Sequence, residues 1–328
     1  MSLRAISRRA GEPRCGVTAV LVTFHASNDE VRQLALALLD QVDTLVIVDN
    51  TPSSGQSKLP RAPLQHERLQ WLAQGRNLGL AKAQNIGIAR ARTIGSRFVL
   101  LVDQDSRPDP NMVRALAEMY DALSARGERV AAVGPLWFDR HTGEAVPFVQ
   151  LGVLSMRSVR ASEVSPEPVR SDVLVASGML IPIAVIEAIG PMDESLFIDL
   201  IDTEWGLRAQ RRGYWLYGVP AARLHHGIGT RAHRVWVGRW RTLPVHAPVR
   251  NYYQVRNILT VFFCRSAPWR WRLVYGLRLL VIVAAGALLN APRGFRIQLM
   301  LRGVWDALVG RLGEYDPEQS PGATPTQP

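Results

Sequence analysis

Short runs of apolar residues recur along the first third of the chain, and polar or turn-forming residues bound each run. The runs cover Val17–Phe24, Thr44–Val48 and Phe98–Val102. Continuous apolar runs of this length are typical of strands buried on both faces, as in a parallel sheet. The segments between them, 29–39 and a stretch that runs through Arg92, have helical patterns. The alternation predicts β-α-β units and a doubly wound α/β fold.

The rest of the chain continues this alternation less regularly. The predicted elements are helices over 109–126 and 202–212 and strands over 130–134 and 173–182. Ser177 and Gly178 interrupt the strand at 173–182, which indicates a bulge or a place where a ligand approaches the backbone. Residues 137–172 contain scattered turn residues, and their pattern is less readable.

Two carboxylates, Asp103 and Asp105, directly follow the apolar run that ends at Val102. Ligands of open α/β sheets bind at the carboxyl ends of the strands, which is where these side chains emerge. Like charges this close raise each other's pKa unless a cation or hydrogen-bond donors neutralise them. Mg²⁺ and Mn²⁺ prefer such oxygen ligands, so the pair predicts a divalent metal site. The alternative is a solvated loop after a strand.

A second acidic cluster, Asp199, Asp202 and Glu204, precedes the helix that runs through Arg212. Near a helix N-terminus the macrodipole stabilises ionised carboxylates. These residues are therefore candidates for acid–base chemistry, and helix capping is the alternative.

The first acidic segment carries a family resemblance. Residues 102–106, Val-Asp-Gln-Asp-Ser, resemble the Asp-x-Asp motif of GT-A glycosyltransferases. The Asp-Gln-Asp-Ser form is similar to bacterial family 2 rhamnosyltransferases that use dTDP-L-rhamnose. The resemblance covers residues 17–260 and implies a GT-A fold, in which helices flank a Rossmann-like, mostly parallel central sheet.

The resemblance also implies an activity. It is the inverting, metal-dependent transfer of L-rhamnose from dTDP-L-rhamnose to a bacterial surface glycan such as O-antigen or exopolysaccharide, free or lipid-linked. The alternatives are a family 2 enzyme that uses another nucleotide sugar, linked to UDP or GDP, and a membrane-associated scaffold without activity.

Site residues follow from the positions that match the family. Asp202 takes the place of the catalytic base, while Ile201 stands where the family often has a second acid, so Asp199 or Glu204 is the expected supporting carboxylate. The expected metal ligands are Asp103, Asp105 and a histidine, for which His226 aligns better than His225; a structural histidine is the alternative.

The residues expected to bind the nucleotide sugar come from several parts of the chain. They are Thr23, Asp49, Asn77, Gly79, Lys82, Asp103, Gln104, Ser177, Gly178, Arg250 and Arg256. Asp49 is expected to accept a hydrogen bond from the base, and ordinary turn chemistry is its alternative. The stretch that begins at Asn77 is expected to present a helix start to the diphosphate. For the two arginines the alternative is the solvated face of an amphipathic helix.

Charge and cysteine content indicate which partners and which cell compartment to expect. The 328 residues include 39 Lys and Arg against 28 Asp and Glu, a net charge of +11, which favours anionic partners. Nucleic acid is not expected, because the sequence has no recognition motif and the basic residues concentrate around the Trp-rich tail. Two distant cysteines indicate neither a disulfide framework nor a zinc site, which fits the cytoplasm.

The composition predicts four segments: a disordered tail at 1–14, a catalytic domain at 15–262, a basic helical extension at 263–315 and a disordered tail at 316–328. Within the extension, Leu273–Leu289 is apolar apart from Arg278, and the uninterrupted part is shorter than a membrane span. It predicts an interfacial helix on anionic lipid at the inner face of the plasma membrane. The alternative is packing against the catalytic core or a second subunit, as in a homo-oligomer.

Overall fold

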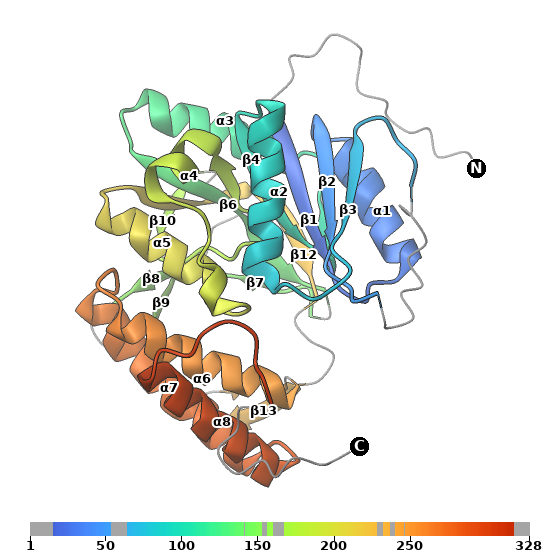
Figure 1. The fold of residues 1–328 in the computed structure, drawn as a ribbon. Coiled ribbons are helices and arrows are strands. Elements are labelled where there is room, and N and C mark those ends of the chain that lie inside the picture. Colours follow the sequence, from blue (N-terminus) through green and yellow to red (C-terminus); the bar gives the residue numbers. More distant parts are fainter. Residues whose placement is uncertain are drawn as a thin grey trace.

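The central sheet begins with four parallel strands. The computed structural model describes residues 16–53, 64–140, 142–152, 156–159, 167–227, 232–236, 240–245 and 247–317. The parallel strands are β1 (Val17–Thr23), β2 (Thr44–Asp49), β3 (Leu69–Ala73) and β4 (Phe98–Asp103), in the spatial order β3-β2-β1-β4. Helices α1 (Asn28–Leu39) and α2 (Leu80–Ile94) make the crossovers (Figure 1). The predicted β-α-β arrangement is confirmed.

Beyond β4 the sheet becomes mixed. Its further strands are β5 (Ser106–Pro108), β6 (Val130–Asp139), β7 (Ala145–Val146), β10 (Val169–Ser171), β11 (Leu180–Pro182) and β12 (Trp215–His226). The short strand β11 lies antiparallel between β4 and β6, whereas the long strands β6 and β12 run parallel to each other. Two separate hairpins are formed by β8 (Phe148–Leu151) with β9 (Met156–Val159) and by β13 (Ala232–Trp236) with β14 (Trp240–Pro244).

Helices cover both faces of the sheet. Besides α1 and α2, the described helices are α3 (Met112–Ala125), α4 (Ile183–Ile189), the 3-10 turn η1 (Glu194–Leu196), α5 (Ile201–Arg211), α6 (Pro248–Phe263), α7 (Trp269–Leu288) and α8 (Arg293–Leu308). Side chains of β1 alternate between two cores: Val20 and Val22 pack with α2, and Ala19 and Leu21 pack with α1 and α3. Burial on both faces explains the continuous apolar run in this strand.

The predicted strand at 173–182 is wrong over most of its length. Only β11, residues 180–182, is extended strand, because Gly178 has φ +83° and the N–H of Met179 closes a turn onto the carbonyl of Ala176. A Cβ at position 178 would lie 2.5 Å from Cγ of Pro135, so only glycine fits there.

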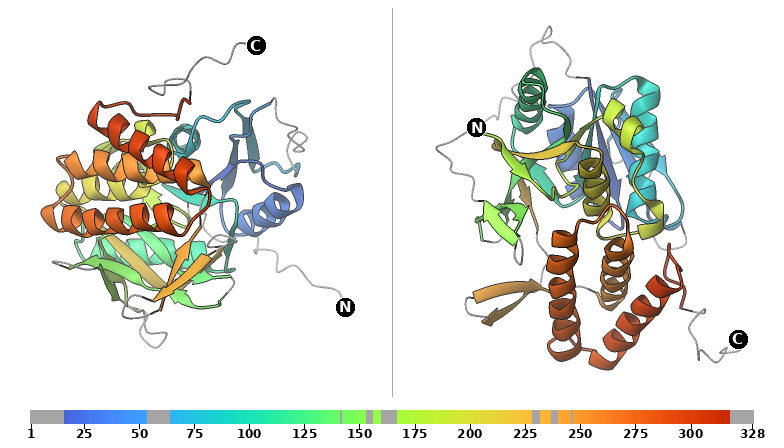
Figure 2. Two further views of the ribbon diagram at one scale, coloured as in Figure 1. Left: turned by 90° about the horizontal axis from the view of Figure 1, so that it is seen from below. Right: turned by 90° about the vertical axis from the view of Figure 1, so that its left-hand side faces the viewer.

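Three helices form a layer at one end of the molecule. Helix α6 packs against both α7 and α8, and Figure 2 shows the three side by side below the sheet. The predicted boundary at residue 262 falls at the end of α6, inside this layer. The predicted tail at 1–14 and most of the one at 316–328 lie outside the described residues.

Candidate active site

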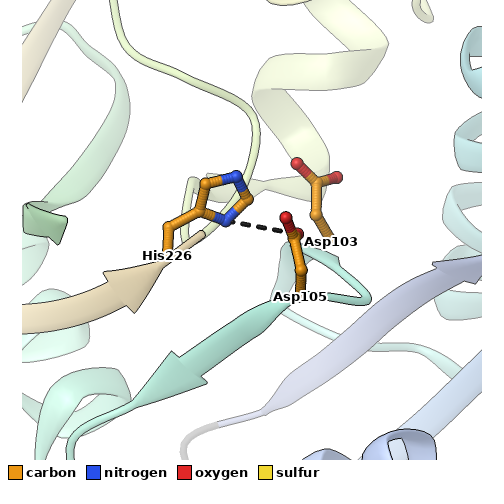
Figure 3. Close-up of side chains that lie close together, drawn as sticks. All are labelled: Asp103, Asp105 and His226. Carbon is orange, nitrogen blue, oxygen red and sulfur yellow. Dashed lines mark ion pairs between the residues drawn. The ribbon is translucent and has the colours of Figure 1, made fainter. Parts of the chain in front are cut away.

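Pairing of β5 with β12 builds the first acidic cluster. The antiparallel register places His226 opposite Ser106 and His225 opposite Arg107. Side chains alternate along a strand, so the register brings His226 to the carboxylates of Asp103 and Asp105. The potential ligand atoms of these three residues all lie within 4.8 Å of one another (Figure 3). His225 instead contacts Asp109 at 3.2 Å.

A chain of hydroxyl groups supports this cluster from beneath. The backbone N–H of Asp103 donates to Oγ of Ser177 at 3.0 Å, and this oxygen lies 2.6 Å from Oγ of Ser106. Oγ of Ser106 lies in turn 3.2 Å from Nδ1 of His226. Ser177 is fully buried, and it holds Asp103 and His226 in place. Contact of Ser177 with the donor stays a prediction.

The electrostatics of the cluster favour a cation. Burial, together with the charges of Asp105 and Asp202, raises the pKa of Asp103 to about 7. Burial lowers the pKa of His226, although Asp105 opposes this effect, so the imidazole is neutral at neutral pH. Two carboxylates that repel each other and one neutral imidazole are a donor set suited to Mn²⁺ or Mg²⁺.

Asp202 faces a cleft at the beginning of α5. Its Oδ2 accepts from the N–H of Ala176 at 3.0 Å, and its Oδ1 accepts from the N–H of Thr203 at 2.7 Å. Burial raises the pKa of Asp202, and these two N–H groups oppose the rise. The cleft has a volume of about 310 Å³ and is also lined by Asp103, so one carboxylate of the first cluster shares this space with Asp199 and Asp202.

The other acids of the second cluster have partners. Asp199 and Arg250 form a two-pronged ion pair on the wall of the cleft, with Nη2 of Arg250 2.9 Å from Oδ1 of Asp199. Glu204 is buried and accepts from Nε of Arg208 at 2.7 Å. Glu204 is not among the described residues that line the cleft, whereas Asp199 is, so the structure favours Asp199 over Glu204 as the supporting carboxylate, and the role itself stays a prediction.

The segment in front of Asp202 is strained and clamped. Phe197, Asp199 and Leu200 all have positive φ, which is unfavourable for residues other than glycine. Nδ2 of Asn257 donates to the carbonyls of Leu196, Ile198 and Asp199 at 2.9, 2.6 and 3.0 Å. These bonds hold the loop that carries Asp199 and leads into the helix of Asp202.

Arg256 belongs to the same clamp. It is completely buried and donates to the carbonyls of Leu196 and Gly313 at 3.0 and 2.6 Å. Its guanidinium also lies against the rings of Tyr252 and Tyr253. These donors are used inside the fold, and binding of phosphate by Arg256 stays a prediction.

The expected nucleotide residues gather at the ends of β1 and β2. Thr23 lies opposite Asp49 in the sheet, and its hydroxyl donates to Oδ1 of Asp49 at 3.3 Å. In the next strand, Asp103 lies opposite Val22. Gln104 bridges back to β1, where its Oε1 accepts from the N–H of Phe24 at 2.7 Å. These ends therefore form one edge beside the acidic cluster.

The start of α2 differs from the expectation. The N–H of Leu80 donates to the carbonyl of Phe197 at 2.7 Å, so this helix start offers its first donor to the protein and not to a diphosphate. Gly79 has φ +83°, and a Cβ there would lie 2.6 Å from Cδ2 of Phe197. Asn77 accepts from Nδ2 of Asn50 at 2.8 Å and shapes the loop.

Lys82 lies apart from the cleft. Its Nζ is 3.6 Å from Glu194, and both side chains are largely exposed. Among the described residues that line the cleft, Lys82 is absent. Its contact with the donor stays a prediction, and the next turn of α2 faces the cleft through another residue.

That residue is Gln84, which is not among the site residues expected from the sequence. Only 2% of its surface is exposed, it lines the cleft, and its buried Oε1 has no hydrogen-bond partner among the described residues. Helices α6 and α7 add Gln254, Tyr275 and Arg278 to the cleft wall. Gln84 follows Leu80 by four residues, which places both on one face of α2. A glutamine on this otherwise apolar face was the signal in the sequence that could have identified it as a site residue.

Comparison with known proteins identifies the family. Residues 18–149 match the profile described as "Glycosyl transferase family 2". The chain is 32% identical over 242 residues to the dTDP-rhamnosyl transferase RfbF of Shigella flexneri, a match that covers 74% of this chain and 78% of RfbF. The chain belongs to glycosyl transferase family 2. The resemblance inferred from the acidic motif is confirmed, and the protein is a glycosyltransferase.

Solved structures place this glycosyltransferase in its fold. GalNAc-T7 with UDP, GalNAc and Mn²⁺ aligns with a TM-score of 0.52 at 12% identity, over 85% of this chain and 58% of that one. Residues 1–349 of TarS from S. aureus align with a TM-score of 0.52 at 13% identity, over 89% of this chain and 80% of that one. These likenesses confirm the expected fold, a mostly parallel mixed sheet with flanking helices and a helical C-terminal part.

Proposed function

We propose that this glycosyltransferase transfers L-rhamnose from dTDP-L-rhamnose to a bacterial surface glycan, with inversion at the anomeric carbon. The observation that carries the donor assignment is the match to RfbF, which extends over most of both chains. The acidic cleft supports the reaction class independently, because Asp103 and Asp202 line it from two distant segments and Asp105 lies beside Asp103.

Asp202 is the proposed base. In an inverting transfer the acceptor hydroxyl oxygen forms the new bond to the anomeric carbon while the bond from that carbon to the diphosphate breaks. Asp202 takes the hydroxyl proton, for which it must be ionised and open to the acceptor. Its two N–H donors hold the carboxylate in one orientation, and its position on the cleft wall leaves it accessible.

Asp103, Asp105 and His226 are the proposed ligands of a divalent cation, Mg²⁺ or Mn²⁺. The fit rests on their spacing and on the raised pKa of Asp103, which is due first to burial and then to the charges of Asp105 and Asp202. A bound cation would offset the charge that grows on the leaving diphosphate. Arg250 lies close enough to lower the pKa of Asp103 and adds positive charge to the same side of the cleft.

The nucleotide is proposed to bind at the edge formed by Thr23, Asp49 and Gln104. These side chains lie at the carboxyl ends of β1, β2 and β4, where open α/β sheets bind their ligands. We place the acceptor on the opposite side of the cleft, against α6 and α7, and propose a lipid-linked glycan at the cytoplasmic face of the plasma membrane.

Calorimetry tests this proposal directly. The full chain is titrated with dTDP and with UDP, each with and without Mn²⁺, and the titrations are repeated on Asp103→Ala/Asp105→Ala. The matched control is Asp121→Ala, which removes an exposed carboxylate on α3 far from the cleft. Metal-dependent binding of dTDP that only the double variant loses would support donor and metal together.

Other results would redirect the assignment. A clear preference for UDP would overturn the rhamnose donor and retain the transferase. Absence of nucleotide binding under all conditions would contradict the proposed transfer as a whole and favour a scaffold.

A further inference from the structure

Helix α8 buries charged side chains beside the apolar Leu299 and Met300, and it exposes other apolar side chains. Arg296, Arg302 and Asp306 are at most 9% exposed, and Nε of Arg302 donates to Oδ2 of Asp306 at 2.8 Å inside the helical layer. Its apolar residues Leu301 and Leu308 are each 64% exposed. A surface helix of a soluble protein normally turns its apolar stripe inward and its charges outward.

The exposed residues of α8 form a continuous stripe. Ile297, Leu301, Trp305 and Leu308 follow one another at spacings of four, four and three, which places them on one side of the helix. All four are exposed. Scattered apolar side chains are common on surfaces, but a stripe of this length marks an interaction surface.

The neighbouring helix α7 repeats the arrangement. Trp271, Val274 and Tyr275 are buried against the rest of the layer, whereas Leu273, Leu277, Leu280 and Val281 are exposed. The polar side of α7 faces the cleft through Tyr275 and Arg278. We call the exposed apolar side chains of these two helices the outer face; its main members are Leu277, Leu280, Ile297, Leu301, Trp305 and Leu308.

The charges around the outer face have one sign. Between residues 263 and 313 the sequence contains a single acid, Asp306, and that residue is buried. The same stretch exposes five arginines, which are Arg265, Arg270, Arg278, Arg293 and Arg311. Exposed Trp269 and Phe295 stand near the ends of the two helices.

We propose that the outer face docks on a lipid bilayer that contains anionic headgroups. Apolar side chains would enter the boundary between headgroups and acyl chains, tryptophans would lie at headgroup depth, and arginines would contact lipid phosphates. A second copy of the chain is a poorer occupant, because pairing two such faces would bring arginines against arginines.

The contacts of α7 favour docking over insertion. Among the described helices it alone has the length and hydropathy of a membrane span. One side of it, however, packs against α6 and lines the cleft, so it cannot be surrounded by lipid without leaving the enzyme. It therefore lies along the bilayer surface.

This orientation has a consequence for the acceptor. Because α7 contributes Tyr275 to the cleft and Leu277 to the outer face, the cleft lies within about 10 Å of the lipid, the diameter of one helix. A lipid-linked acceptor could reach Asp202 from the bilayer. This consequence rests on the proposed function, but docking itself needs neither donor nor transfer, so the two can fail separately.

Vesicle flotation of the full chain tests the docking. The vesicles contain phosphatidylcholine alone or phosphatidylcholine with phosphatidylglycerol, and the variant is Leu301→Glu/Trp305→Glu. Its matched control is Leu36→Glu, because Leu36 is a similarly exposed leucine on α1. We expect wild type and control to float with the anionic vesicles, and the double variant to bind at least tenfold more weakly.

A second pair of variants tests the charge. Arg270→Gln/Arg293→Gln should weaken binding to anionic vesicles by roughly fivefold per arginine, whereas Arg126→Gln, an exposed arginine after α3, should not. Thermal unfolding and nucleotide binding serve as folding controls for every variant.

Two results would overturn the docking. One is wild-type protein that does not float with anionic vesicles, or floats equally after Leu301→Glu/Trp305→Glu. The other is a dimer in light scattering without lipid that this double variant dissociates, because the occupant would then be a second copy.

Discussion

Replacement of Asn257 by alanine removes the amide that clamps the loop in front of Asp202. Nδ2 of Asn257 reaches three backbone carbonyls, at 2.9, 2.6 and 3.0 Å, from a position with no exposed surface. The neighbouring Arg256 also donates to one of these carbonyls, that of Leu196. The loss of hydrogen bonding would therefore be greatest at the carbonyls of Ile198 and Asp199.

The expected cost follows from those bonds. The amide has two hydrogens, and each net hydrogen bond contributes about 1 kcal/mol, while a buried carbonyl left without a donor costs about 1–3 kcal/mol. We expect Asn257→Ala to lower the free energy of unfolding by about 2–4 kcal/mol. In the variant, Phe197, Asp199 and Leu200 could leave their positive φ angles, which cost about 1–3 kcal/mol each. This relaxation would reduce the loss of stability.

The catalytic effect should exceed the effect on donor binding. Release of the loop moves Asp202 and Asp199, and a displacement of about 1 Å at a reacting group can lower the rate about a hundredfold. The KM for the donor should change little, because the edge at Thr23 and Asp49 does not contact this loop through any described hydrogen bond.

Thermal unfolding and initial-rate kinetics on Asn257→Ala measure both effects. Thr260→Ala is the matched control, because Thr260 lies one turn further along α6 and its hydroxyl bonds only within the helix, to the carbonyl of Arg256. Wild-type kcat in Asn257→Ala, or an equal loss in Thr260→Ala, would refute the role of the clamp.

Four further predictions address single residues. Asp202→Asn should lower kcat by about 10²–10⁴-fold with dTDP binding intact, because the proton acceptor is lost, together with one of the two backbone N–H contacts; near-normal kcat would remove the base assignment. The pKa of Asp103 is raised to about 7, so below that pH Mn²⁺ must displace a proton. The Mn²⁺ dissociation constant in calorimetry should thus rise about tenfold per pH unit from pH 7 downward, and a flat profile would contradict this. Gln84→Leu should raise the donor KM several-fold without lowering the unfolding midpoint, because its unpaired Oε1 contributes nothing to the fold; an unchanged KM would exclude donor contact. Gly79→Ala should destabilise the protein more than Gly95→Ala in thermal unfolding, because both have positive φ but only position 79 also meets Phe197; equal losses would refute the steric argument.

The pattern of apolar and polar residues along the sequence was enough to predict the parallel strands and the position of Asp103. The apolar runs at 17–24, 44–48 and 98–102 became buried parallel strands, because burial on both faces requires an apolar side chain at every position. Asp103 followed from the same logic, since a polar residue directly after such a strand emerges at the ligand-binding edge.

Contacts between distant segments decided what local pattern could not. His226 was favoured only slightly over His225 until the register of β5 with β12, which joins residues 120 positions apart, placed it beside Asp105. For Arg256, the sequence shows the charge and not the carbonyls that surround it.

The sequence by itself determined the fold class, the acidic clusters and the family, because these depend on residue type and spacing along one segment. Only the tertiary structure decided which acids share a cleft, which arginines are internal and which side of α8 meets solvent. Hydrophobic periodicity shows that a helix has two sides, but it takes the packed neighbours to show which side is buried. In α8 the buried side includes Arg302 and Asp306 as well as Leu299 and Met300, because Asp306 and Tyr252 provide polar partners inside the helical layer.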